Sequence, residues 1–376
     1  MSEGFPPAEY RARAERARAA MAREGLGALL LTTEADVRYF TGFLTRFWES
    51  PSRPWFLVLP VGADPIAVIP SIGAALMART WITDIRTWPA PRPGDDGVGL
   101  LCETLREVGG PVGVPSHHET HLRMPLSDFD RLRGDSNLVF TGDRGIVAGL
   151  RAVKSEAEVA RIAATCAVAG RAFARVGEVA GVGVPLSAVF RGFQRLLLEE
   201  GADWVPYLAG GAGPKGYADV ISPASDTPLA AGDVLMLDTG AVRGGYFCDF
   251  DRNFAVGHAD GRARAAHAQL IDATAAGLEA AQPGARACDV WRAMAGITGD
   301  GEGGGRLGHG LGMQLTEGLS LTAADETVLV PGMVITLEPA VETAPGRIMV
   351  HEENILVTDS GPYALSPLAG PELPVV

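Results

Sequence analysis

The sequence predicts two domains, an α/β domain over residues 1–149 and an α+β domain over residues 150–376. At 376 residues the chain is too long for one ordinary hydrophobic core, so two domains are the first expectation. Short apolar segments alternate with helical segments in the first part, as they do in layered α/β domains. Long helices are mixed with strands that carry acidic residues in the second part, and a basic turn after Gly149 separates the two patterns.

The first domain is predicted from short apolar runs bounded by Gly, Pro or polar residues, which are typical of buried strands. Its expected elements are a helix at 8–24, strands at 28–33, 55–61 and 65–70, a helix at 98–108 and a strand at 110–116. Their alternation indicates strands and helices in separate layers.

The second domain is predicted to begin with a long helix. Ser155 and Glu158 form a capping-box pattern, so we expect the helix to start there. Further expected elements are helices at 186–200, 263–280 and 287–295 and strands at 233–242, 246–257, 333–342 and 353–361. The Gly-rich stretch 208–219 lacks the spacing of a phosphate-binding loop, and we expect a mobile surface loop there.

The bulk properties exclude some classes of function. A net charge of −13 argues against a nucleic-acid partner, because no basic stripe is available to neutralise phosphates. No apolar run approaches membrane-spanning length, and the first residues show no signal-peptide pattern. The four cysteines show no CxxC spacing, so reduced, mostly buried thiols are expected. These features predict a cytoplasmic protein.

Four carboxylates and one imidazole stand out in the second half, and they are Asp238, Asp249, His309, Glu338 and Glu352. Asp238 and Asp249 flank a Gly-Gly pair, which is a hairpin signal, so they can lie close together across paired strands. Two carboxylates in a core repel each other and raise each other's pKa unless a cation is present. This oxygen-rich set suits two divalent cations such as Mn, Co, Fe or Zn that share one hydroxide. The sequence therefore predicts a metallohydrolase.

The frames around these residues resemble the pita-bread metallopeptidase family, which includes methionine aminopeptidase, aminopeptidase P, prolidase and creatinase. The frames are LDTG at Asp238, CDFDRNF at Asp249, GHGLG at His309, LEP at Glu338 and HEEN at Glu352. The resemblance covers roughly residues 150–365, and the first half is similar to the α/β domain of prolidase and creatinase in layout only. It implies two bound metal ions, with Mn favoured, and a homodimer.

Two positions depart from the family pattern. The family's HExP frame, seven residues after the ligand His, reads TEGL here and places Thr316 where the second His is expected. The region 219–226 lacks the other substrate-contacting His. Thr316 and Tyr217 are therefore candidate substrate contacts. Trp48 and Arg53, in the unusual loop 45–55, are candidates too; the loop either reaches the active site of a partner subunit or packs at a dimer interface.

The resemblance implies hydrolysis of an amide bond. Two metals lower the pKa of a bridging water, whose hydroxide attacks the carbonyl. Glu338 and His309 are the expected catalytic residues, with Glu338 carrying a proton to the leaving nitrogen. Xaa-Pro dipeptides are the default substrate. A small non-peptide amide, as for creatinase or ectoine hydrolase, is the alternative. A metal-assisted lyase fits less well, because Thr239 and Gly240 follow Asp238 where that branch has a further Asp. A non-enzymatic binder is disfavoured because all five ligands are present.

Overall fold

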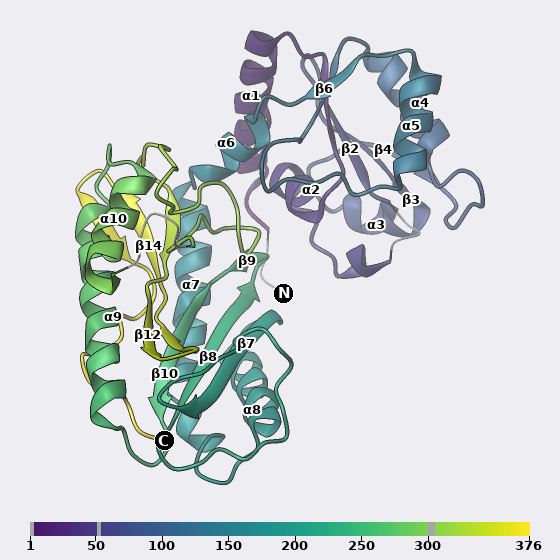
Figure 1. Cartoon of the computed structure of the whole chain (residues 1–376). Helices are drawn as coiled ribbons and strands as arrows, with labels where there is room; N and C mark the ends of the chain where they lie inside the picture. Colours follow the sequence, from purple (N-terminus) through teal and green to yellow (C-terminus); the bar gives the residue numbers. More distant parts are fainter. Residues whose placement is uncertain (1–3, 51–53, 300–304) are drawn as a thin grey trace. The chain divides into compact units, whose positions relative to one another are not determined.

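The structure is a computed structural model that describes residues 4–50, 54–299 and 305–376. The chain divides into two compact units, one ending at Arg151 and the other running from Ala152 to Val376. Figure 1 colours the two units along the sequence.

The first unit is built around a six-stranded sheet with the order β4-β3-β2-β1-β5-β6. The β1–β2 and β2–β3 pairs are antiparallel, and the β1–β5, β3–β4 and β5–β6 pairs are parallel. Its strands are β1 (Ala28–Leu31), β2 (Phe56–Pro60), β3 (Ile66–Pro70), β4 (Asp84–Trp88), β5 (Val112–Val114) and β6 (Phe140–Gly142). Its α-helices are α1 (Pro7–Glu24), α2 (Glu34–Thr41), α3 (Ala74–Met77), α4 (Val98–Val108), α5 (Leu126–Ser136) and α6 (Ile146–Ala152). The predicted α/β organisation is confirmed.

The second unit combines four long helices with curved antiparallel sheets. Its helices are α7 (Glu156–Phe173), α8 (Leu186–Glu199), α9 (Gly261–Ala280) and α10 (Ala287–Thr298). Its strands are β7 (Trp204–Pro214), β8 (Asp233–Arg243), β9 (Tyr246–Phe247), β10 (Phe250–Ala255), β11 (Val334–Leu337), β12 (Ala340–Ala344), β13 (Arg347–Val350), β14 (Glu353–Thr358) and β15 (Gly361–Ala364). They form a sheet β10-β8-β7 with β9 on β8, a sheet β11-β14-β15 and a pair β12-β13.

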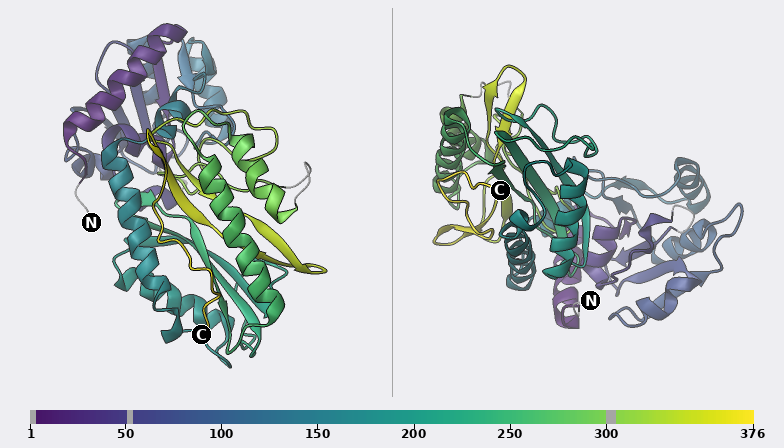
Figure 2. Two further views of the ribbon diagram at one scale, coloured as in Figure 1. Left: turned by 90° about the vertical axis from the view of Figure 1, so that its left-hand side faces the viewer. Right: turned by 90° about the horizontal axis from the view of Figure 1, so that it is seen from below.

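The helices of this unit pack against the strands. α7 contacts β8, α8 contacts β7, and α9 packs on α10 and β12 (Figures 1 and 2). The predicted capping box at the start of α7 is confirmed: the Ser155 side chain accepts from the Glu158 backbone, and the Glu158 carboxylate accepts from the Ser155 backbone.

The Gly-rich stretch 208–219 is a loop only in its second part, after Pro214, and the sequence prediction is wrong for its first part. Leu208 to Pro214 belong to β7, which pairs with β8 along its length and places Ala209 opposite Asp238. The glycines serve close packing here. A Cβ on Gly210 would lie 2.2 Å from the carbonyl oxygen of Met236, and φ at Gly210 is +148°, which favours glycine. Crowding by the neighbouring strand, rather than mobility, explains the composition.

Candidate metal centre

The five predicted ligands come from the middle of one strand, from positions next to the ends of three others and from one extended segment. Asp238 lies within β8, Asp249 immediately precedes β10, and Glu352 immediately precedes β14. Glu338 follows the last residue of β11. His309 belongs to a segment that runs beside β11, because its backbone N–H donates to Thr336 Oγ1 at 3.0 Å.

The structure brings these side chains together. His309 Nε2 lies 2.9 Å from Glu338 Oε1 and 3.4 Å from Asp249 Oδ2. Asp249, His309 and Glu352 each offer one ligand atom, and these atoms lie within 4.8 Å of one another. His309 Nδ1 lies 2.9 Å from the carbonyl oxygen of Gly310, so a proton on Nδ1 donates there and leaves Nε2 to face the carboxylates.

Three of the proposed ligands each have one buried carboxylate oxygen without a hydrogen-bond partner among the described residues: Asp238 Oδ1, Asp249 Oδ1 and Glu352 Oε1. A buried ionised oxygen without a partner is costly, and natural proteins pair such groups or bind a metal. Burial, followed by repulsion from neighbouring carboxylates, raises the pKa of Asp238 and of Glu352 well above the usual range. The residues therefore fit divalent cations, which would satisfy these oxygens and cancel their repulsion.

In the metal-free protein, the imidazole of His309 neutralises part of the negative charge of these carboxylates. Burial lowers the pKa of His309, but hydrogen bonds to Asp249 and Glu338 outweigh burial and raise that pKa to about 10. Burial raises the pKa of Asp249 to about 6 despite the opposing effect of His309. Burial acts in the same direction on Glu338, but the contact with His309 prevails and lowers its pKa to about 2. A protonated His309 thus stands in for a cation.

The glycines around His309 let the segment fit between its neighbours. A Cβ on Gly308 would lie 2.2 Å from the carbonyl oxygen of Thr336, and one on Gly310 would lie 1.9 Å from that of Glu317. The segment around His309 therefore lies close to the backbone of Thr336 on one side and of Glu317 on the other, as the sequence suggested. Without this close approach, His309 would stand away from Glu338.

The candidate substrate contacts lie in different surroundings. Thr316 accepts a hydrogen bond from Arg306 Nη2 at 3.4 Å, and Arg306 is among the groups that lower the pKa of Asp249. Thr316 is thus linked to a residue whose charge acts on Asp249. Its neighbour Glu317 makes a buried ion pair of 2.9 Å with Lys154, which fixes this segment.

Tyr217 is only 1% exposed and packs in a hydrophobic cluster. Its hydroxyl donates to Asn253 Oδ1 at 3.1 Å and accepts from the Val350 backbone at 2.7 Å. In this arrangement Tyr217 braces the core and does not line an open site. Trp48, in the first unit, is buried against Trp55. Arg53 lies outside the described residues.

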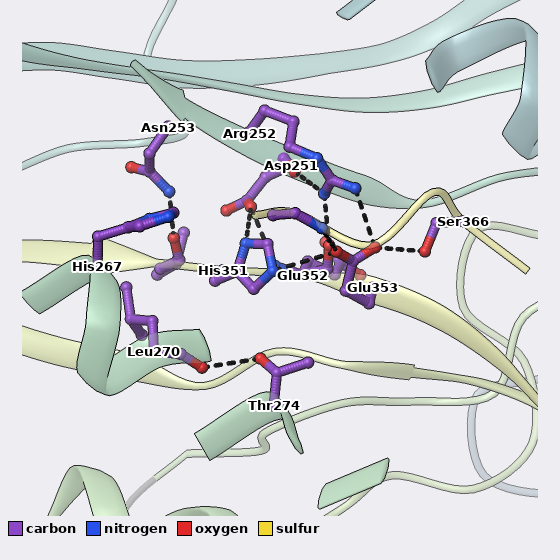
Figure 3. A network of polar contacts seen from close by, with 12 residues as sticks. Asp251, Arg252, Asn253, His267, Leu270, Thr274, His351, Glu352, Glu353 and Ser366 are labelled. Carbon is purple, nitrogen blue, oxygen red and sulfur yellow. Dashed lines mark hydrogen bonds and ion pairs between the residues drawn. The ribbon is translucent and has the colours of Figure 1, made fainter. Parts of the chain in front are cut away.

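Several residues outside the proposed ligand set contact the proposed ligands, and two of them, Tyr207 and Asn354, were not singled out from the sequence. The Tyr207 hydroxyl, from β7, donates to Asp238 Oδ2 at 2.9 Å. Asp251 accepts from the Glu352 backbone at 3.0 Å, and Asn354 contacts the Asp249 backbone. His351, the neighbour of Glu352, lies between Asp251 and Glu353 in the network that Figure 3 shows. For Asn354 the only sequence signal is a polar residue two positions after Glu352.

Comparison with known protein families decides the relationship. The family model described as metallopeptidase family M24 matches residues 160–359, and the model of the creatinase/prolidase N-terminal domain matches residues 13–153. The chain belongs to metallopeptidase family M24. It is a metal-dependent hydrolase by this membership, and the predicted family is confirmed.

Relatives of this M24 protein span its whole length. The probable dipeptidase PepE of Mycobacterium tuberculosis is 30% identical over 383 aligned positions, which cover 97% of this chain and 96% of the relative. The Xaa-Pro dipeptidase of Pyrococcus horikoshii is 28% identical over 250 positions, which cover 65% of this chain and 71% of the relative. The crystal structure of dipeptidase PepE from Mycobacterium ulcerans superposes with a TM-score of 0.85 at 28% identity, covering 100% of both chains. The two-domain architecture with a pita-bread second domain is confirmed.

No helix in the described part of this M24 chain is long and apolar enough to cross a membrane.

Proposed function

We propose that this chain is a dinuclear metal-dependent dipeptidase that hydrolyses the amide bond of Xaa-Pro or related dipeptides. The observation that carries the proposal is the convergence of four carboxylates and one imidazole, with three buried carboxylate oxygens left unpartnered among the described residues. The set holds more donor atoms than one small cation uses, which supports two ions. The relatives whose names contain dipeptidase support the substrate class.

Asp238, Asp249, His309, Glu338 and Glu352 would hold the two ions, and the oxygen-rich donor set makes Mn a suitable metal. When bound, such ions activate a water molecule and polarise the amide carbonyl. His309 must lose its Nε2 proton to take part, while its Nδ1 stays oriented by the Gly310 carbonyl.

Glu338 is the carboxylate best placed to move a proton. Its side chain is 23% exposed, whereas that of Asp249 is 5% exposed, so water and substrate reach Glu338 more readily. Thr336 Oγ1 donates to Glu338 Oε1 and orients the carboxylate. Glu338 would accept a proton from the attacking water and pass it to the leaving nitrogen.

A small non-peptide amide is the second candidate substrate. Thr316 stands where the family's second His is expected, and region 219–226 supplies no other imidazole. A shorter side chain at Thr316 leaves more room beside the centre and one basic group fewer to hold a peptide. This departure favours a substrate whose recognition differs from that of the usual peptides.

The test is turnover of a panel of Xaa-Pro dipeptides by Mn-reconstituted protein, with metal-free protein as the control. We expect metal-dependent release of proline. If two bound metals are verified and no dipeptide is cleaved, the peptidase assignment fails and small amides become the substrates to screen. Asp249→Asn should remove metal and activity together, and full activity in that variant would contradict the dinuclear mechanism.

A further inference from the structure

We propose that Asp251 and Asn354 form a reciprocal brace that holds the metal ligands Asp249 and Glu352 at their working separation before any metal binds. The proposal rests on the proposed metal centre and assigns positioning roles to two residues that do not belong to its ligand set. Each residue stands two positions after one ligand and holds the backbone of the other ligand.

Asn354 forms the first half of the brace. It is fully buried, and its Oδ1 accepts the backbone N–H of Asp249 at 3.0 Å. Its Nδ2 donates to the backbone carbonyl of the same residue. The Cys166 thiol donates to Oδ1 at 3.2 Å and helps to orient the amide. One side-chain amide therefore satisfies both backbone groups of Asp249, as a neighbouring strand would do.

Asp251 forms the second half. It is 1% exposed, and its Oδ1 accepts the backbone N–H of Glu352 at 3.0 Å. His351 Nδ1 lies 3.3 Å from the same oxygen, and His351 Nε2 lies 3.2 Å from Glu353 Oε1. Glu353 in turn accepts from Arg252 at 3.1 Å (Figure 3). The carboxylate that holds Glu352 is thus itself held by a buried network.

The brace is needed because no backbone ladder joins the two ligand-bearing strands in the described part of the chain. β10 belongs to the sheet with β7 and β8, whereas β14 belongs to the sheet with β11 and β15. Residues next to these two strands must nevertheless converge on shared cations. Asp251 and Asn354 supply, by side chains, the cross-links that a ladder would supply between paired strands.

Preorganised ligands bind metal more tightly because less ordering is left to the binding step. Loss of groups that orient ligands typically lowers metal affinity by about 10–100-fold. Asn354→Ala removes both contacts to Asp249, so we expect Mn affinity to fall by at least about tenfold. A residue that served only the fold would lower the melting temperature and leave metal affinity unchanged.

Asn253→Ala is the matched control. Asn253 is also a buried asparagine, 2% exposed, and its side chain bridges β10 to β13 by donating to the Val350 carbonyl at 2.6 Å. It contacts no backbone group of a proposed ligand. We expect both variants to lose stability, whereas Mn affinity, measured by chelator competition, changes less than about twofold in Asn253→Ala. Wild-type Mn affinity in a folded Asn354→Ala variant would overturn the proposal.

A measurement on the unaltered protein covers the case in which Asn354→Ala does not fold. Amide hydrogen exchange at Asp249 and Glu352 is compared between metal-free and Mn-loaded protein. Strong protection in both states supports a preformed brace, and protection that appears only with Mn contradicts it. If the wild-type protein binds no Mn, the proposed function itself fails. If it binds two ions and Asn354→Ala binds them equally well, only the brace fails.

Discussion

At the scale of single residues, the centre is a set of like charges that no protein group neutralises in full. Glu352 shows this most clearly: burial and then the charges of Asp249, Glu338 and Asp238 raise its pKa well above the usual range. Its Oε1 has no hydrogen-bond partner among the described residues. The only cationic counterpart in direct contact with the described ligands is His309, which cannot both hold its proton on Nε2 and bind a metal.

Replacing Glu352 should therefore have opposite effects on the two forms of the protein. Glu352→Gln removes a carboxyl group whose ionised form is disfavoured by burial and by its neighbours, so we expect the metal-free protein at pH 7 to melt at the wild-type temperature or a few degrees higher. Stabilisation by saturating Mn, about 3–4 kcal/mol for a metal at 100 to 1,000 times its Kd, should be largely lost. Thermal unfolding with and without Mn measures both effects. A large destabilisation of metal-free Glu352→Gln would contradict the prediction.

Metal binding should release protons, because the pKa values of His309, Asp238 and Glu352 are raised in the metal-free protein. His309, with a pKa of about 10, holds its proton at pH 7 and must lose it to bind a cation. With at least one proton released, apparent Mn affinity should rise by about tenfold per pH unit between pH 6 and 8. Calorimetry in buffers of different ionisation enthalpy counts the protons. Affinity that is independent of pH in this window would show that the metal-free site is already deprotonated.

At the scale of elements, glycine allows strands and segments to approach closely where side chains would separate them. In β7 this freedom brings the strand onto β8 and places Tyr207 next to Asp238. In the segment around His309 it brings the imidazole beside the end of β11. The glycine patterns are therefore part of the site, although no glycine is a ligand.

Gly310→Ala tests this role. The added Cβ would meet the Glu317 carbonyl oxygen at 1.9 Å, so the segment must shift and carry His309 away from Glu338. We expect a loss of about 1–3 kcal/mol of stability together with weaker Mn binding. Gly296→Ala in α10 is the control: no atom lies within 4 Å of its Cβ, and alanine should stabilise that helix by about 0.5–1 kcal/mol. Wild-type stability and Mn affinity in Gly310→Ala would count against the packing argument.

At the scale of the whole molecule, all five proposed ligands and both brace residues belong to the unit that begins at Ala152. The first unit has its own hydrophobic core around the six-stranded sheet. Metal binding can therefore be measured on the second unit by itself. The predicted homodimer, the cytoplasmic location and the roles of Trp48 and Arg53 stay predictions.

We expect residues 152–376 to fold alone and to bind Mn with the stoichiometry of the full chain, because that unit contains every ligand and a core of its own. Metal analysis and circular dichroism of the isolated unit, beside the full-length protein, measure this. Dipeptide turnover in the same two samples reports what the first unit adds. A folded isolated unit that binds no metal would show that the first unit helps to build the centre.

Much of the centre was predictable from sequence, because each ligand stands in a local frame that makes little physical sense without a cation. Glu338 ends an apolar strand and Glu352 opens another. Burying either charge without a partner would therefore destabilise the folded protein. The glycines around His309 likewise indicate that this backbone lies close to another part of the chain. They do not indicate which part that is. Helix starts such as the capping box at Ser155 also depend on residues within one turn.

The contacts that escaped sequence reasoning span long separations. Asn354 contacts Asp249 over 105 positions, and Asp251 contacts Glu352 over 101 positions. Nothing local to either residue marks such a partner. The sequence by itself predicted the two-domain organisation, the four long helices of the second unit and the candidate ligand set, because these depend on periodicity, caps and the cost of buried charge. Only the tertiary structure decided that β7 is a strand and that Asp251 and Asn354 hold the ligands, because those facts depend on which distant backbone lies alongside.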